Sequence, residues 1–266
     1  MTDQISVLLS QLGFRFGNGG PHASRTMMLE DLRLLLRAAP NNANRLDYMG
    51  AVVKDNVLGK PTRKTRELSW KYLATLYGFE ASNPLFRAMR LLWDVEEDAQ
   101  PMLALAVALA RDPLLRLTQS YYLCQESGTA LPREMMESFL EERLPGRMGP
   151  ASIKSLAQNV AGTWTAAGIL SGRIRKVRAK PRVTPCAVAM MLFMGYLEGR
   201  SGQRLFTSDW TALLDCSGDE LDVFASSASH RGLIVFMNAG GVREVRFPDY
   251  LTAEEERVRQ EVSYVV

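Results

Sequence analysis

Histidine and cysteine are scarce in this chain. Its 266 residues include two histidines and three cysteines, and no two cysteines have the Cys-x-x-Cys spacing. This scarcity argues against a disulfide framework and against a zinc site, and we expect no metal site. We interpret Cys124, Cys186 and Cys216 as small buried side chains of a protein in a reducing cytoplasm. His22 and His230 are too far apart in sequence to suggest a ligand pair.

Motifs of the common enzyme classes are also missing. The sequence has no nucleophile elbow, no His-Glu-x-x-His, no Walker loop and no dinucleotide fingerprint. The glycine-rich loop 17–21 lacks the Gly-Lys-Ser/Thr ending of a nucleotide-binding loop. We therefore expect no catalytic residue, no cofactor and no small-molecule substrate. The convergent carboxylates of a metal-dependent nuclease would leave no such linear motif.

Long apolar runs are absent as well. The longest, VTPCAVAMMLFMGYLEG at 183–199, is shorter than the roughly 20 residues that a membrane-spanning helix needs. It predicts a buried helix in the core of a soluble protein. The N-terminus has neither a basic n-region nor a clear cleavage site, so we expect no signal peptide. These features favour a cytoplasmic protein without membrane contact.

The sequence does contain a long series of helical patterns. Apolar residues three and four positions apart, often with proline at the start, predict seven helices before residue 145. They cover residues 25–39, 45–55, 61–79, 83–95, 100–112, 113–127 and 132–144. Ser24 is expected to cap the first, and Gly78 to follow the third. We predict a mainly α fold, with a helical core and winged helix-turn-helix modules that carry small β-hairpin wings.

One window of the chain has no acidic residue. Between Leu144 and Leu197 there is no Asp or Glu, and the window carries +8 on a chain whose formal net charge is +3. Its basic residues are Arg147, Lys154, Arg173, Arg175, Lys176, Arg178, Lys180 and Arg182. The remainder of the chain therefore carries −5. Such a local excess of positive charge is the electrostatic footprint of a nucleic-acid binder.

The order of patterns in this window is that of a winged helix-turn-helix. A helix capped by Ser152 is followed by a short apolar strand, a Ser-Gly turn and the cationic stretch RIRKVRAKPRV. We expect the helix to lie in or near the major groove and the ribbon along the backbone or minor groove. The predicted contacts from the helix are Lys154, Ser155, Gln158 and Asn159. Those from the wing are Arg173, Arg175, Lys176, Arg178, Lys180 and Arg182, and we expect the first four to be exposed.

A second basic group opens the predicted helix 61–79. Cations at a helix N-terminus oppose the helix dipole, so they do not stabilise the helix. They suit either a solvated basic face or a helix start that faces phosphate. The residues are Lys60, Arg63, Lys64 and Arg66.

The C-terminal region repeats the winged-helix order with the opposite charge. Thr207 or Ser208 can cap a short helix, Ser217 and Glu220 have capping-box spacing, and GLIVFMN, AGG and VREVRFP predict a β-hairpin. Residues 206–266 contain five arginines and eleven acidic residues. An acidic module is better suited to protein docking, dimerisation or capping the core. We divide the chain into a helical domain (1–143), a basic winged helix-turn-helix (144–200) and an acidic winged-helix-like module (201–266).

Two stretches, VVKDNVLGKPTRKTRELSWKYLATLYGF and NPLFRAMRLLW, resemble the N-terminal signature of the BrxA family of bacterial BREX phage-defence systems. The resemblance covers residues 25–195 and rests on Asn56, Leu58, Lys60, Thr62, Arg66, Leu76, Tyr77, Phe86, Arg87 and Trp93. It implies an all-helical, non-enzymatic accessory protein of antiviral defence that binds double-stranded DNA and works with other defence-system proteins. It assigns no catalytic residue and says least about the acidic module.

Other interpretations of the basic window remain open. The window would equally suit an adaptor that docks on an acidic protein within a multiprotein defence complex. It would also suit an RNA-binding helical protein, because positive charge alone does not distinguish duplex types. The plainest alternative is a flexible, solvated basic loop without a dedicated partner.

Overall fold

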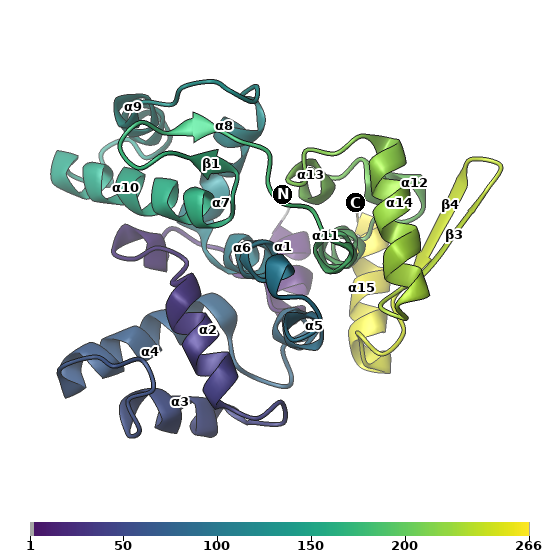
Figure 1. Cartoon of the computed structure of the whole chain (residues 1–266), viewed down its shortest axis with the longest axis horizontal. Helices are drawn as coiled ribbons and strands as arrows, with labels where there is room; N and C mark the ends of the chain where they lie inside the picture. The colour runs from purple at the N-terminus through teal and green to yellow at the C-terminus, as the bar shows by residue number, and fades with distance from the viewer. Residues whose placement is uncertain (1–2, 266) are drawn as a thin grey trace.

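The helices of the chain form three lobes around a central helix pair (Figure 1). The computed structural model describes residues 3–265. The N-terminal part contains α1 (Asp3–Gln11), η1 (Pro21–Ala23), α2 (Leu29–Ala38), α3 (Arg45–Val53), α4 (Arg63–Tyr77), α5 (Pro84–Trp93), η2 (Glu97–Ala99) and α6 (Gln100–Arg111). The predicted mainly α fold with small hairpins is confirmed. Among the described residues, no helix is both long enough and apolar enough to span a membrane.

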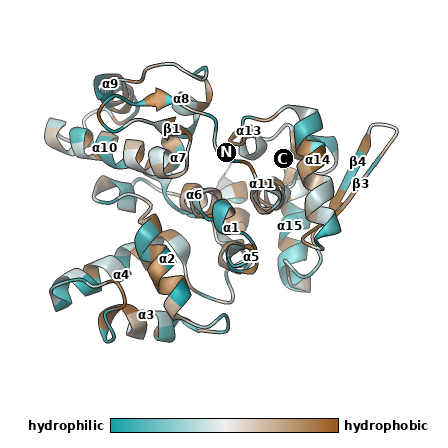
Figure 2. Cartoon of the chain, viewed as in Figure 1, coloured by the Kyte–Doolittle hydropathy of each residue, from teal (hydrophilic) through white to brown (hydrophobic). Residues whose placement is uncertain are grey.

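The central pair consists of α6 and α11 (Pro185–Leu197), which pack against each other. Met102–Ala110 in α6 is buried at every position, and so is Cys186–Gly195 in α11. A helix that is apolar all round must be enclosed on all sides, which explains why both helices lie in the middle of the molecule. Figure 2 shows the apolar colouring of this centre. The buried helix predicted within 183–199 is confirmed.

The second lobe has the element order of a winged helix. It contains α7 (Pro113–Leu117), α8 (Gln119–Leu123), α9 (Arg133–Arg143), α10 (Pro150–Ala166), β1 (Leu170–Ser171) and β2 (Val177–Arg178). β1 and β2 pair antiparallel, and Ala130 forms a further bridge to Val177. The wing is therefore backed by a short extended segment ahead of α9. The unit reaches back to the helices before residue 144, because α9 packs on α10.

The third lobe repeats this order. Around α11 it contains α12 (Gln203–Phe206), α13 (Asp209–Ala212), α14 (Gly218–His230), β3 (Val235–Ala239), β4 (Val242–Arg246) and α15 (Ala253–Val265). The capping box of Ser217 and Glu220 and the cap at Ser208 are confirmed. The hairpin turns at Gly240 and Gly241, whose φ angles of 60° and 84° give the two left-handed positions of a type I′ turn.

Three local expectations are wrong, and a fourth, the burial of the cysteines, holds only for Cys186. Ser24 does not cap α2, which begins at Leu29 after a left-handed Met28, and Ser152 lies inside α10, which begins at Pro150. Proline is preorganised for the first helical position, so the N-cap of α10 is Gly149, three residues before Ser152. The cysteines differ in burial: Cys186 is buried, Cys216 is partly buried and Cys124 is exposed. The predicted helix 113–127 is divided into α7 and α8.

A buried polar network joins the N-terminal loop to two helices. His22, Asp112 and Thr163 are fully buried. His22 Nδ1 lies 2.7 Å from Asp112 Oδ2, and His22 Nε2 lies 2.8 Å from Thr163 Oγ1. Asp112 Oδ1 also caps α7 by accepting the Leu114 and Leu115 N–H groups. Burial raises the pKa of Asp112, but hydrogen bonds and the charge of His22 lower it more, so the pKa of this carboxyl lies below its usual value.

We predict that Asp112→Ala lowers the free energy of unfolding by about 3 kcal/mol, because it leaves buried donors without a partner. Asn44→Ala is the matched control: it removes a solvent-exposed N-cap, and about 1 kcal/mol is expected. Urea unfolding at pH 7 measures both, and equal losses would contradict the account. Since the folded pKa of Asp112 is lowered, its contribution is present above the unfolded pKa and is lost as the pH falls through the folded value.

Candidate nucleic-acid interface

A groove of about 400 Å³ lies between α10, the start of α9 and the β1–β2 hairpin. Three cations line it, Arg133, Arg173 and Lys176, together with the Gln158 amide. Apolar and aromatic side chains complete the lining, and within the described residues no carboxylate belongs to it. We call this feature the basic groove. Its charge and its polar amide suit an anionic partner with hydrogen-bonding groups.

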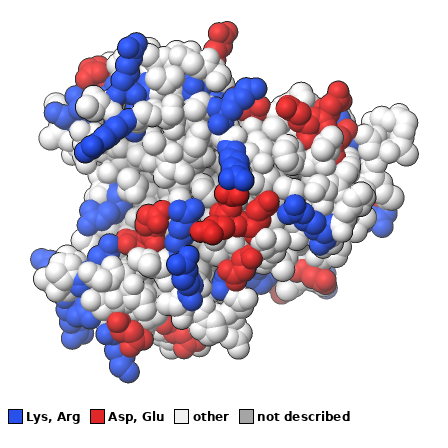
Figure 3. All heavy atoms as spheres, viewed as in Figure 1, with Lys and Arg blue, Asp and Glu red and all other residues white. Residues whose placement is uncertain are grey.

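Four cations of the predicted interface form no ion pair among the described side chains, and two of them, Arg173 and Lys176, line the basic groove. Lys154, Arg173 and Arg175 are exposed and have no ion-pair partner among the described side chains. The Lys176 ammonium donates to the Gly172 carbonyl at 2.7 Å, and burial lowers the pKa of Lys176. Figure 3 shows blue side chains gathered over the lobe of α9 and α10, at the upper left of the view. This lobe therefore keeps the positive charge that the sequence placed there.

Arg178 is a correction to the predicted interface. Arg178 is only 4% exposed, unlike Arg173 and Arg175 at the tip of the wing. The guanidinium donates to the Tyr122 carbonyl at 3.3 Å, to the Ile169 carbonyl at 3.4 Å and to the Ala179 carbonyl, and Nη2 lies 3.5 Å from Asp215 Oδ2. Its charge is satisfied inside the fold. Arg178 thus anchors the wing and is not available to a ligand.

The last two cations of the wing lie close to acidic groups. Arg182 forms an ion pair with Asp98 at 2.6 Å, although both side chains stay largely open to solvent. Lys180 is exposed. The pKa of Glu220 is lowered mainly by hydrogen bonds from the Ser217 backbone and hydroxyl, and the charge of Lys180 lowers it further. Lys180 therefore lies near the acidic module and Arg182 near η2 of the N-terminal part, and neither residue lines the basic groove.

The predicted recognition face of α10 is divided. Lys154 and Gln158 are exposed, and Ser155 is partly exposed. Asn159 instead donates to the His22 carbonyl at 3.0 Å, so its amide holds the N-terminal loop. A side chain at Gly162 would meet Thr26 at 3.1 Å, so the small residue also serves that packing. One side of α10 is therefore open and the other is covered.

The basic group of α4 lies in a different lobe from the wing (Figure 1). Lys60 pairs with Asp31 at 2.8 Å, and Arg63 pairs with Glu67 at 2.8 Å one helical turn away. Lys64 is exposed and Arg66 is partly buried. The structure therefore does not bring these four residues together with the basic groove.

Arg133 belongs to the groove but was not among the predicted residues. It lies at the start of α9, where it forms ion pairs with Glu134 at 3.1 Å and Glu137 at 2.5 Å. Because α9 is rich in glutamate, charge counting along the sequence hides this arginine. In the sequence, only Pro132 indicates that Arg133 lies at a helix start. The pairing of residues 128–131 with the wing, which brings Arg133 to the groove, is visible only in the structure.

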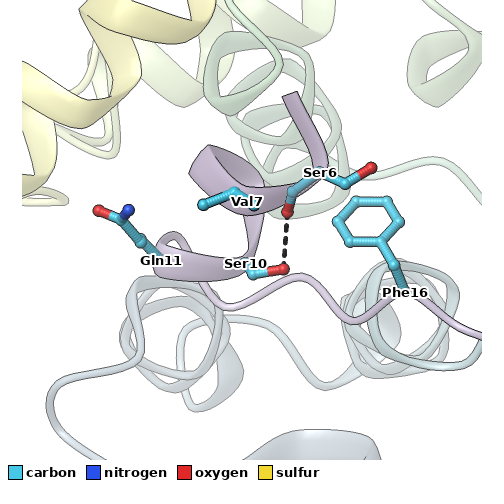
Figure 4. A pocket seen from close by; sticks show the side chains of 5 residues that line it. All are labelled: Ser6, Val7, Ser10, Gln11 and Phe16. Carbon is cyan, nitrogen blue, oxygen red and sulfur yellow. Dashed lines mark hydrogen bonds between the residues drawn. The ribbon is translucent and has the colours of Figure 1, made fainter. Parts of the chain in front are cut away.

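Other hollows of the molecule offer less chemistry. The depression beside α1 in Figure 4 is lined by Ser6, Val7, Ser10, Gln11 and Phe16. The Ser10 hydroxyl donates to the Ser6 carbonyl of its own helix at 2.7 Å, and none of these five lining side chains is titratable. A larger hollow near α13 contains Glu198, and burial raises the pKa of this carboxyl. Its Arg116 is already held by the Leu109 and Arg15 carbonyls.

The His22 network has the residue types of a catalytic triad but not the access of one. Thr163 Oγ1 already accepts the Met27 N–H at 2.8 Å, and all three side chains are closed to solvent. A triad nucleophile must reach its substrate, so this network is structural. Within residues 3–265 no group of three or more His, Cys, Asp or Glu side chains is placed to hold a metal ion.

The fold has a distant counterpart among solved structures. No protein-family model matches the chain, and no curated protein matches it. The solved structure "Magnesium ion-bound SspB crystal structure" is similar over 96% of this chain and 99% of that chain, with a TM-score of 0.53 and 10% sequence identity. At this identity the likeness concerns the fold alone.

The division between anchoring and free cations predicts different outcomes for two neighbouring arginines. Arg178→Ala should lower the free energy of unfolding by about 2 kcal/mol or more, because buried carbonyls lose a charged donor. Arg175→Ala, the matched control, should change it by less than about 0.5 kcal/mol, because its side chain is in solvent. Thermal and urea unfolding measure both. A stable Arg178→Ala variant would show that the anchor is dispensable.

Proposed function

We propose that the chain is a non-enzymatic accessory protein that binds duplex DNA through the basic groove, within a bacterial phage-defence system of the BREX type. The observation that carries this proposal is the lining of the groove, where Arg173 and Lys176 meet the exposed Gln158 amide and no carboxylate is among the described lining residues. Arg133, the third cation, is paired with Glu134 and Glu137. In this arrangement the cations bind phosphates and release counterions. Gln158, one turn from Lys154 on α10, is the side chain suited to a base edge.

The order of elements supports the same function. A helix followed by a β-hairpin wing is a common arrangement for binding duplex DNA, with the helix at one groove and the wing at the backbone beside it. Lys154, Arg173, Arg175 and Lys176 supply about four phosphate contacts, since Arg178 is buried and Arg182 is paired. A plot of the logarithm of the binding constant against the logarithm of the salt concentration should then have a slope of about −4.

The assignment to phage defence rests on the resemblance of residues 25–195 to the BrxA family. The SspB structure shares the fold and adds nothing to this assignment. The magnesium of that neighbour is not part of the proposal, because the described lining of the basic groove has no carboxylate to offer a cation.

An adaptor role is the second candidate, and the acidic C-terminal module favours it. This lobe exposes Val235, Met237 and Val242 on its hairpin. It would contact other defence-system proteins while the basic lobe stays free. Binding of RNA in place of DNA is the third candidate, which the same titration distinguishes.

We predict that the variant Arg173→Ala/Arg175→Ala/Lys176→Ala binds duplex DNA at least about tenfold more weakly, with a salt slope reduced by about 3. The control Arg204→Ala/Arg246→Ala/Arg257→Ala removes the same charge from the acidic module, where all three side chains are exposed. It should bind like the parent protein. Fluorescence anisotropy with labelled duplex DNA, duplex RNA and single strands at several salt concentrations measures both.

Equal weakening of the two variants would mean that overall charge, and not the basic groove, controls binding. The absence of DNA binding by the parent protein at low salt would favour the adaptor. Tighter binding to duplex RNA than to duplex DNA would favour the RNA-binding alternative.

A further inference from the structure

The tip of the first hairpin exposes an isoleucine almost completely. Ile174 is 96% exposed, the highest value among the exposed large apolar side chains of the described residues. Single apolar side chains on a surface are common, so exposure alone carries no function. The neighbours of Ile174 are what matter: it lies between the exposed Arg173 and Arg175, at the edge of the basic groove.

The tip is held in one shape by its own contacts. Gly172 has a φ of 86°, and a Cβ at this position would lie 2.1 Å from the Arg175 carbonyl oxygen. The backbone therefore closes on itself at a glycine that no larger residue could replace without strain. Lys176 Nζ donates back to the Gly172 carbonyl at 2.7 Å. These contacts fix the three residues between them as an outward-pointing loop.

The base of the hairpin is rigid as well. The Leu131 N–H donates to the Lys176 carbonyl at 2.8 Å, and the Gly128 N–H donates to the Arg178 carbonyl at 2.8 Å. The buried Arg178 side chain ties the same strand to the Tyr122 and Ile169 carbonyls. A tip on such a base can transmit force to a ligand, because little conformational freedom remains to be lost on binding.

We infer that Ile174 is an apolar wedge that enters the minor groove of duplex DNA, inserts between base pairs and kinks the helix. The inference rests on the proposed function. Only the tip side chain enters the minor groove, which is about 6 Å wide, because a two-stranded ribbon as a whole needs the wider major groove. Arg173 and Arg175 then contact the phosphates on either side, while the Ile174 side chain moves from solvent into contact with the stacked bases. Apolar wedges beside cations are the means by which minor-groove proteins bend DNA.

The test measures bending separately from binding. A duplex of about two helical turns with donor and acceptor dyes at its ends is saturated with the full-length protein, and the end-to-end distance is read from energy transfer. We expect the parent protein to bend the duplex by about 20–90°. Ile174→Ala should bind up to about tenfold more weakly and leave the saturated duplex straight. Ile174→Leu should keep the bend.

Two controls separate the wedge from other effects. Val242→Ala removes an exposed apolar side chain beside the turn of the second hairpin, where Val242 is 74% exposed; bending should not change. Arg175→Ala should weaken binding but keep the bend at saturation. Sedimentation with phosphatidylserine vesicles checks for a lipid partner, and no Ile174-dependent binding is expected there.

The outcomes distinguish the two proposals. A parent complex with a straight duplex, or an Ile174→Ala complex as bent as the parent, would overturn the wedge and leave the proposed function intact. The absence of duplex binding by the parent protein would overturn both. Ile174-dependent binding to the vesicles with a straight duplex would assign the tip to a membrane surface instead.

Discussion

The candidate interface depends on one buried cation. The guanidinium of Arg178 donates to backbone carbonyls of α8, of the chain before β1 and of the residue after β2, and it lies 3.5 Å from Asp215 in the acidic lobe. A buried charge is tolerated only when such partners surround it. Because Arg178 is enclosed in this way, the strand that carries it cannot rotate or slip. The residues just before it, Arg173 to Lys176, are therefore presented from a fixed base.

The lobes of this chain differ in charge, and the net charge of the whole chain does not show that difference. The formal net charge of +3 hides a basic winged helix and an acidic one. Where the two lobes approach, their charges meet, as in the pair of Arg178 with Asp215. Away from that boundary the basic groove has no carboxylate in its described lining. The acidic lobe thus neutralises the near side of the basic lobe and leaves the far side open for an anionic partner.

The sequence predicted the elements of the fold better than the surroundings of individual side chains. Helical spacing located α3, α5, α6 and α11, and the Gly-Gly turn located the second hairpin, because these signals are local. The burial of Arg178 could not be predicted, since its partners come from residues 122, 169, 179 and 215.

The same limit applies to the other misplaced side chains. Asn159 contacts the loop at His22, which lies far away in the sequence. Lys60 and Arg63 form a basic cluster in the sequence, although Asp31 and Glu67 pair with them in the fold. Arg133 was missed because glutamates surround it in sequence.

The central claim is that the basic lobe, and not the acidic one, meets duplex DNA. Hydrogen exchange of the full chain, followed by mass spectrometry with and without a saturating duplex, tests it most directly. The account predicts slower exchange in residues 151–158 and 172–177 on adding DNA, and no change in the hairpin at 235–246. Slower exchange confined to the acidic hairpin, or no change anywhere in the chain, would contradict it.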